Sequence, residues 1–89
     1  MTAHDQSVLR VYTHPACRSC REVLVAANEL AAERDDLTVE LSSLASEAGL
    51  ERAQARGILV VPAVEFGDTV VESALTKEEL AALVDGEGA

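Results

Sequence analysis

The sequence predicts a single α/β domain built on a four-stranded mixed sheet with helices on both faces. The first observation is the order of its segments, because strand-like and helix-like patterns follow one another as β-α-β-α-β-β-α along the 89 residues, with no repeat and no linker. The second is connectivity, since a β-α-β crossover makes its two strands parallel and the later β-β hairpin is antiparallel. The third is composition, since 48% hydrophobic residues suffice for one modest core.

The first strand is expected at residues 8–13. Its nearly continuous apolar character suits an interior parallel strand that is covered on both faces, and Pro15 ends it. A helix is expected from about Arg18 to Arg34, because apolar residues recur there at the spacing of one buried stripe. The residues of this stripe are Val23, Leu24, Ala27, Leu30 and Ala31.

The middle of the chain predicts a second strand and a second helix. Residues 37–41 alternate apolar and polar side chains with the period of a half-buried strand. Residues 44–56 have a helical composition, but Gly49 interrupts them, so a later helix start near Glu47 or Leu50 stays open. The glycine that follows Arg56 suits the left-handed residue that often comes after a helix end.

The last third of the chain predicts a β-hairpin and a capped helix. Residues 58–66 form an apolar strand that a proline breaks, and residues 69–72 pair with it antiparallel. The Gly67-Asp68 pair between them suits a type II′ turn, in which the first central residue has positive φ. Thr76 and Glu79 have the spacing of a capping box at the start of the final helix.

The two ends of the chain are expected to lie outside the domain. We expect residues 1–7 to form a flexible N-terminus, residues 8–84 a single domain, and residues 85–89 an acidic C-terminal tail. The N-terminus lacks the basic and apolar regions of a secretory signal, and no apolar run approaches the roughly 20 residues that cross a bilayer. We therefore expect a cytoplasmic protein that does not enter a membrane.

The charge of the chain restricts its partners. The net charge is −9, from 16 acidic and 7 basic residues. Nucleic acids and anionic membranes are bound by clustered cations, so neither is an expected partner. The acidic surface indicates a soluble protein, and we expect a monomer.

Two cysteines carry the clearest functional signal. Cys17 and Cys20 stand where the first strand has ended and a helix begins, and a Cys-x-x-Cys in a chain with β-α-β order is typical of a redox site. A helix N-terminus stabilises a thiolate through its unpaired N–H groups and its dipole, and a second thiol one turn away can resolve a mixed disulfide. Two structural cysteines, or half of a metal site, are the alternatives.

A metal site needs more ligands than these cysteines supply. Zinc takes about four ligands, and only His14 and His4 add strong candidates. His14 is close in sequence, but His4 lies in the N-terminal segment. No metal is therefore expected within one chain, whereas zinc or an iron–sulfur cluster bridged between two chains stays open.

Two segments resemble a known family. Residues 12–20 read Tyr-Thr-His-Pro-Ala-Cys-Arg-Ser-Cys, and residues 60–64 read Val-Val-Pro-Ala-Val. The first resembles the active site of glutaredoxins and glutaredoxin-like thioredoxins, and the second resembles the stretch that carries their cis-proline. The resemblance implies a thioredoxin-like fold. The chain departs from the family at Val11, where thioredoxin has an aspartate, and at residues 71–75, which lack the glycine pair that helps glutaredoxins hold glutathione.

The resemblance implies roles for the residues of the site. Cys17 is the nucleophile, and Cys20, which is more buried, is the resolving thiol. Pro62 is cis and packs against the disulfide, which leaves the Val61 backbone free to pair with an extended substrate segment. The charge of Arg18 could lower the pKa of the Cys17 thiol or attract an acidic substrate. The alternative is a solvated side chain in the first turn of the helix.

Two neighbouring residues have less specific roles. His14 stands where glutaredoxins often have lysine, and when protonated it would stabilise the thiolate and make the activity depend on pH. The alternative is an exposed turn histidine. Tyr12 packs in the core or at its rim, and a substrate contact is the lesser alternative.

The expected function is that of a thiol-disulfide oxidoreductase that reduces protein disulfides through Cys17 and Cys20. Its partners are a disulfide-containing protein substrate and an upstream reductase. It needs no cofactor beyond its own redox-active disulfide, although glutathione stays open. The alternatives are a binding module or a metal or iron–sulfur carrier that uses the same cysteines, and a glutathione-dependent glutaredoxin.

Overall fold

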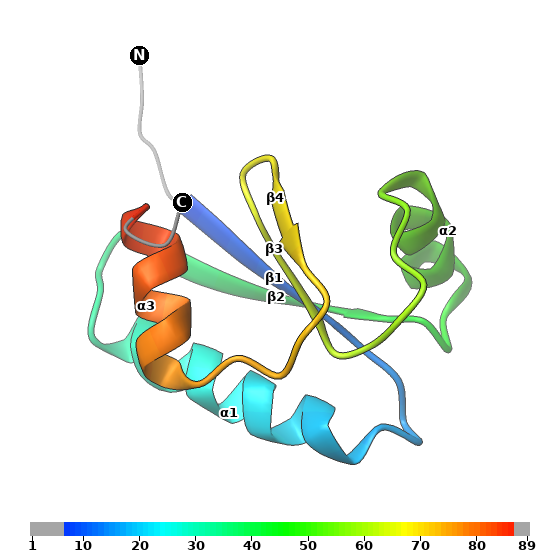
Figure 1. The fold of residues 1–89 in the computed structure, drawn as a ribbon, viewed down its shortest axis with the longest axis horizontal. Coiled ribbons are helices and arrows are strands. Elements are labelled where there is room, and N and C mark those ends of the chain that lie inside the picture. Colours follow the sequence, from blue (N-terminus) through cyan, green and yellow to red (C-terminus); the bar gives the residue numbers. More distant parts are fainter. Residues whose placement is uncertain (1–6, 87–89) are drawn as a thin grey trace.

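The computed structural model describes residues 7–86 of the chain. Figure 1 shows α1 and α3 on one side of a sheet and α2 on the other, so the α/β architecture is the predicted one. The elements in chain order are β1 (Ser7–Thr13), α1 (Arg18–Ala32), β2 (Leu37–Ser43), α2 (Glu47–Ala55), β3 (Ala63–Phe66), β4 (Thr69–Val71) and α3 (Lys77–Asp85).

The four strands form one mixed sheet in the order β2-β1-β3-β4. β1 and β2 are parallel, with Val11 beside Leu41, because α1 crosses over between them. β3 is antiparallel to β1, with Val11 beside Val64, and β4 is antiparallel to β3. β1 is therefore an interior strand, and the turn that follows it leaves from the middle of the sheet.

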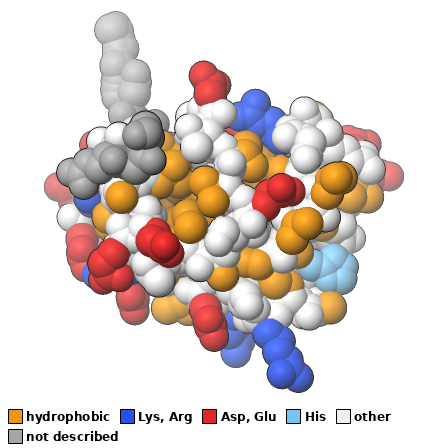
Figure 2. Space-filling view, in the orientation of Figure 1, with side chains coloured by type: hydrophobic (Ala, Val, Ile, Leu, Met, Phe, Trp, Pro, Cys, Tyr) orange, Lys and Arg blue, Asp and Glu red, His pale blue; other side chains and the backbone are white. Residues whose placement is uncertain are grey.

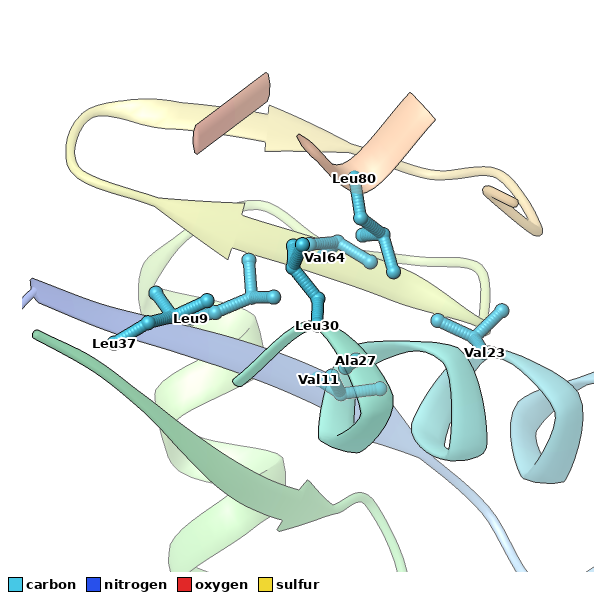
Figure 3. Close-up of a cluster of buried hydrophobic side chains, with 8 residues drawn as sticks. All are labelled: Leu9, Val11, Val23, Ala27, Leu30, Leu37, Val64 and Leu80. Carbon is cyan, nitrogen blue, oxygen red and sulfur yellow. The ribbon is translucent and has the colours of Figure 1, made fainter. Parts of the chain in front are cut away.

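Buried aliphatic side chains fill the space between the sheet and helices α1 and α3 (Figure 3). Leu9 and Val11 of β1 face this cluster, while Tyr12 packs on the opposite face with Ala53 of α2. Burial of a side chain of leucine or valine size contributes roughly 1.5–3 kcal/mol to the stability of the fold. Packing of such side chains stabilises the helices on both faces of the sheet. The cluster consists of Leu9, Val11, Val23, Ala27, Leu30, Leu37, Val64 and Leu80.

The turn and the cap in the second half of the chain are as predicted. Gly67 has φ 61°, and no described non-glycine residue has positive φ, which is the pattern of a type II′ turn. The Thr76 hydroxyl accepts a hydrogen bond from the N–H of Glu79 at 3.1 Å, and the Glu79 carboxylate accepts one from the N–H of Thr76 at 2.8 Å. This reciprocal capping box determines where α3 begins.

The apolar strand expected at residues 58–66 is shorter in the structure, where β3 begins only at Ala63. The backbone N–H groups of Leu59 and Val60 donate to the carboxylate of Glu72 rather than to a neighbouring strand. The proline before β3 has no N–H to offer a strand ladder. The residues before Ala63 therefore form a loop in spite of their strand-like composition.

Other boundaries differ by a few residues. β2 extends to Ser43, two residues beyond its predicted end, and α1 ends at Ala32. α2 begins at Glu47, which is one of the starts that the sequence left open. The hydroxyl of Ser46 caps this helix by accepting from the N–H of Gly49 at 3.0 Å.

The ends of the domain differ from expectation by one residue each. Ser7, expected in the flexible N-terminus, belongs to β1, and Asp85, expected in the tail, is the last residue of α3. The rest of the expected N-terminal segment, residues 1–6, and residues 87–89 of the expected tail lie outside the described residues. None of the helices described combines the length and the apolar character that a membrane crossing needs.

Candidate active site

Cys17 and Cys20 are joined by a disulfide bond at the start of α1, and their Cα atoms are 5.5 Å apart. Cys17 is the N-cap residue of the helix, and its sulfur accepts a hydrogen bond from the backbone N–H of Cys20 at 3.2 Å. The N–H groups of a first helical turn lack partners within the helix, so they favour negative charge on this sulfur. No residue of this turn is acidic. The geometry therefore favours a thiolate at Cys17 once the disulfide is reduced.

The two cysteines differ in accessibility. Cys17 is half-buried, whereas Cys20 is only 3% exposed. A bulky disulfide substrate can therefore meet the Cys17 sulfur directly, while the Cys20 sulfur can reach that of its neighbour. This is the arrangement that a nucleophile and a resolving thiol require.

The turn between β1 and α1 carries His14. Its Nδ1 accepts a hydrogen bond from the N–H of Ala16 at 3.1 Å, and its carbonyl accepts one from the N–H of Cys17 at 2.9 Å. Arg18 follows directly as the first residue of α1, and both side chains are exposed. The structure thus places both residues beside the disulfide, as predicted from their positions.

The Val61–Pro62 peptide bond is cis, as the family resemblance implies. β3 follows immediately, and its first residue, Ala63, lies beside Tyr12 near the end of β1. The antiparallel register therefore brings Pro62 level with the residue that leads into the cysteine turn. Figure 1 shows the start of β3 and the end of β1 at the same end of the sheet. The cis-proline and the disulfide share this end.

Glu72 holds the loop that leads to the cis-proline. One oxygen of its carboxylate accepts hydrogen bonds from the N–H groups of Leu59 at 2.8 Å and Val60 at 3.2 Å. Leu59 is 87% exposed and Val60 is 56% exposed, so the anchored loop presents two apolar side chains to solvent. Sequence reasoning missed Glu72, because its partners lie 13 and 12 residues away and no local pattern marks the pairing.

Tyr12 is fully buried, and its hydroxyl donates a hydrogen bond to the Glu65 carboxylate at 2.6 Å. Burial, together with that hydrogen bond and the charge of Glu65, raises the pKa of Tyr12 to about 12. The tyrosine therefore stays protonated at neutral pH and acts as a donor. Of the two roles considered for Tyr12, packing in the core is the one that this burial shows.

Glu65 is the centre of a charged network on the α2 side of the sheet. Its carboxylate pairs with Arg56 and, at 3.6 Å, with Arg10. Burial alone would raise the pKa of Glu65, but the hydrogen bond from Tyr12 and the two arginine charges outweigh burial and hold that pKa below its ordinary value. The sequence carried one hint of this network, because a glutamate between two apolar strand residues must find partners when it is buried.

A surface groove of about 310 Å³ opens beside the disulfide. Leu24 of α1 and Leu41 of β2 contribute apolar walls. Leu41 lies on an outer strand of the sheet and is 57% exposed. The residues that line the groove are Thr13, His14, Pro15, Cys17, Cys20, Arg21, Leu24, Leu41 and Ser43.

The side chains of residues 7–86 include no group of three or more histidine, cysteine or acidic residues that could hold a metal ion. Within the site, Nδ1 of His14 is used by its own turn and the two sulfurs are bonded to each other. A metal bound through these cysteines would therefore need the reduced state and further ligands from outside residues 7–86.

The mixed sheet in the order β2-β1-β3-β4, with a cysteine pair at the start of α1 and a cis-proline before β3, defines a thioredoxin-like fold. An uncharacterized thioredoxin-like protein from Clostridium perfringens is similar with a TM-score of 0.81 and 17% identity, over 93% of this chain and 71% of that one. Thioredoxin O2 from Arabidopsis thaliana in the oxidized state has a TM-score of 0.77 and 15% identity, over 91% and 74%. Thioredoxin f2 from Chlamydomonas reinhardtii has a TM-score of 0.75 and 18% identity, over 93% and 80%.

These similarities establish the fold, and the cysteine pair adds the chemistry. No protein-family description and no curated protein sequence matches the chain. The thioredoxin-like fold together with the bonded pair of Cys17 and Cys20 supports a function of the redox type.

Proposed function

We propose that this protein is a thiol-disulfide oxidoreductase that reduces the disulfide bonds of protein substrates. The observation that carries the proposal is the sulfur pair at the N-terminus of α1, in which Cys17 is accessible and Cys20 is buried. The place of Pro62 directly before β3, level with the end of β1, supports it, because the backbone of Val61 at this end of the sheet can pair with an extended substrate segment.

The reaction consists of two thiol-disulfide exchanges. The Cys17 thiolate attacks one sulfur of the substrate disulfide, a mixed disulfide forms, and one substrate thiolate leaves. The Cys20 thiolate then attacks the Cys17 sulfur, the intramolecular disulfide forms, and the second substrate thiolate leaves. Two electrons pass from the protein dithiol to the substrate, whose two thiolates take up protons. An upstream reductase restores the dithiol by supplying two electrons and two protons.

The proposal includes the subtype of the protein, its location and its direction of electron transfer. Its motif from Tyr12 to Cys20 favours a small glutaredoxin-like thioredoxin. We expect it to act in the cytoplasm as a monomer without a bound cofactor. The reduction potential determines the direction of electron flow, since a value of about −270 mV suits a reductant and one of about −120 mV suits an oxidant.

Reduction of insulin by the fully reduced protein tests the proposal. The wild type should react, and Cys17→Ser should be inactive because the attacking sulfur is missing. Cys20→Ser should accumulate a mixed disulfide, visible by mass spectrometry, because nothing resolves it. Ser19→Ala is the matched control, since it changes the residue between the cysteines and keeps both sulfurs. Equal rates for the wild type and Cys17→Ser would overturn the proposal.

A further inference from the structure

We propose that the groove beside the disulfide binds an acidic, aliphatic segment of the protein substrate, a specificity that rests on the proposed oxidoreductase function. Both Cys17 and Cys20 line this groove of about 310 Å³, so a segment next to a substrate cystine would occupy it while the cystine meets Cys17. The groove lies between α1 and the outer strand β2, whereas the cis-proline precedes β3 on the other side of β1. It therefore offers a contact in addition to backbone pairing at Val61.

The cations of this acidic chain are distributed unevenly. Of the 7 lysine and arginine residues, four pair with carboxylates. Arg18, Arg21 and Arg52 form no ion pair with a carboxylate of residues 7–86. Arg18 and Arg21 both stand in the first turns of α1, and Arg21 lines the groove. Two of these three arginines, which are available to bind a partner, thus lie beside the disulfide. The paired cations are Arg10, Arg34, Arg56 and Lys77.

The walls of the groove suit an aliphatic side chain. Leu24 and Leu41 are apolar, and no acidic residue is among those that line the groove. An aliphatic substrate side chain would bury surface against both leucines, and a carboxylate next to it would reach the guanidinium of Arg21. Glu22, which follows Arg21 in the chain, is exposed and forms no ion pair with the cations of residues 7–86, so it does not occupy the guanidinium of Arg21.

The surface around the groove adds long-range selectivity. Figure 2 shows acidic side chains mostly at the left and around the margin of the molecule, and basic side chains at its top, at its left and at the lower edge, where α1 runs in Figure 1. With a net charge of −9, most of the surface repels an acidic segment. The arginines at the start of α1 attract it, so association is directed toward the disulfide.

Three peptides test the inference. Each is closed by one disulfide, carries a leucine beside one cysteine, and differs only in the next residue, which is Glu, Gln or Lys. The fully reduced wild type is mixed with each peptide, and the second-order rate constant of reduction is measured by acid quenching and chromatography. The Glu peptide should react about threefold to tenfold faster than the Gln peptide at low salt, and the Lys peptide should react slowest. High salt should bring the three rates together.

Matched variants assign this preference to the groove. Arg21→Gln and Arg18→Gln should each lower the Glu-to-Gln rate ratio by about twofold to fivefold. The rate with the Gln peptide reports any change in sulfur reactivity, so the ratio isolates recognition of the carboxylate. Arg52→Gln removes the α2 cation that has no carboxylate partner within residues 7–86, and it should leave the ratio unchanged. Leu41→Ala should slow all three peptides, and Leu50→Ala, which shortens an exposed leucine of α2, should slow none.

The outcomes separate this inference from the proposed function. Equal rates for the three peptides, or a ratio that Arg52→Gln lowers as much as Arg21→Gln does, would overturn the inference and leave the oxidoreductase function intact. Failure to reduce any peptide or insulin would remove the proposed function itself. Self-association of the wild type that Arg21→Gln abolishes would assign the groove to a second copy of the chain, and would also overturn the inference.

Discussion

Glu72 shapes the loop before the cis-proline, although its own side chain is exposed. Its carboxylate is the acceptor for the N–H groups of Leu59 and Val60. In Glu72→Ala these amides have only water as a partner, so the loop should open more often. We expect their amide hydrogens to exchange about threefold to tenfold faster than in the wild type, measured by nuclear magnetic resonance.

Glu72→Gln is the control for this prediction, because the glutamine oxygen still accepts both hydrogen bonds and only the charge is lost. Its exchange rates should lie closer to those of the wild type than to those of Glu72→Ala. Unchanged exchange at Leu59 and Val60 in Glu72→Ala would show that other contacts hold the loop.

The residues that sequence reasoning identifies differ from those it misses in the range of their contacts. Cys17 and Cys20 are three residues apart at a helix start, so their spacing alone brings them together. Tyr12 and Glu65 are 53 residues apart and meet only through the register between β1 and β3. The sequence shows that a buried glutamate needs partners, but the register decides which residues those partners are.

At the scale of elements, α2 contains a glycine that its packing requires. A Cβ atom on Gly49 would lie 1.9 Å from the carbonyl oxygen of Ser43 at the end of β2. Alanine normally stabilises a helix by about 1 kcal/mol relative to glycine, but here the helix would have to move away from the strand. We expect Gly49→Ala to lower the free energy of unfolding by about 1–3 kcal/mol, measured by urea denaturation and circular dichroism.

Glu51→Ala serves as the comparison for Gly49→Ala, because it introduces alanine at an exposed position of the same helix. It should change the free energy of unfolding by less than about 0.5 kcal/mol. If Gly49→Ala were more stable than the wild type, helix propensity would outweigh the close approach to Ser43.

Elements with a clear periodic pattern are predictable, and those shaped by distant contacts are not. The apolar stripe of α1 and the alternation in β2 each placed an element within two residues of its observed ends. The segment 58–62 has strand-like side chains, yet Glu72 takes two of its amides and Pro62 offers none. Gly49 interrupts a helical pattern in the sequence, whereas the structure uses it inside α2.

At the scale of the whole molecule, charged pairs join elements that are distant in sequence. Lys77 pairs with Glu33 and Arg34 with Asp85, and these two pairs connect α3 to residues at the end of α1. Exposed pairs of this kind contribute about 0–1 kcal/mol each. Glu65 is different because it is only 8% exposed and its partners come from β1 and from the residue that caps the end of α2.

The stability of the fold should therefore depend on pH through Glu65. The pKa of this carboxyl is lower in the folded protein than its ordinary value of 4.5, so the folded state binds the proton less readily than the unfolded chain. The ionised carboxylate consequently adds stability above that ordinary value. This contribution is lost as the pH falls through the lower pKa of the folded state.

A comparison of the wild type with Glu65→Gln isolates this contribution from the other carboxylates, which titrate in both proteins. We expect the variant to unfold with about 1–3 kcal/mol less free energy at neutral pH, and the difference to shrink as the pH falls toward about 3. Urea titrations followed by circular dichroism measure it. Glu40→Gln removes a charge from the exposed partner of Arg10, and its smaller effect is the reference. A difference for Glu65→Gln that stays constant over this pH range would mean that the hydrogen bond and packing of residue 65, rather than its ionisation, connect β3 to β1 and α2.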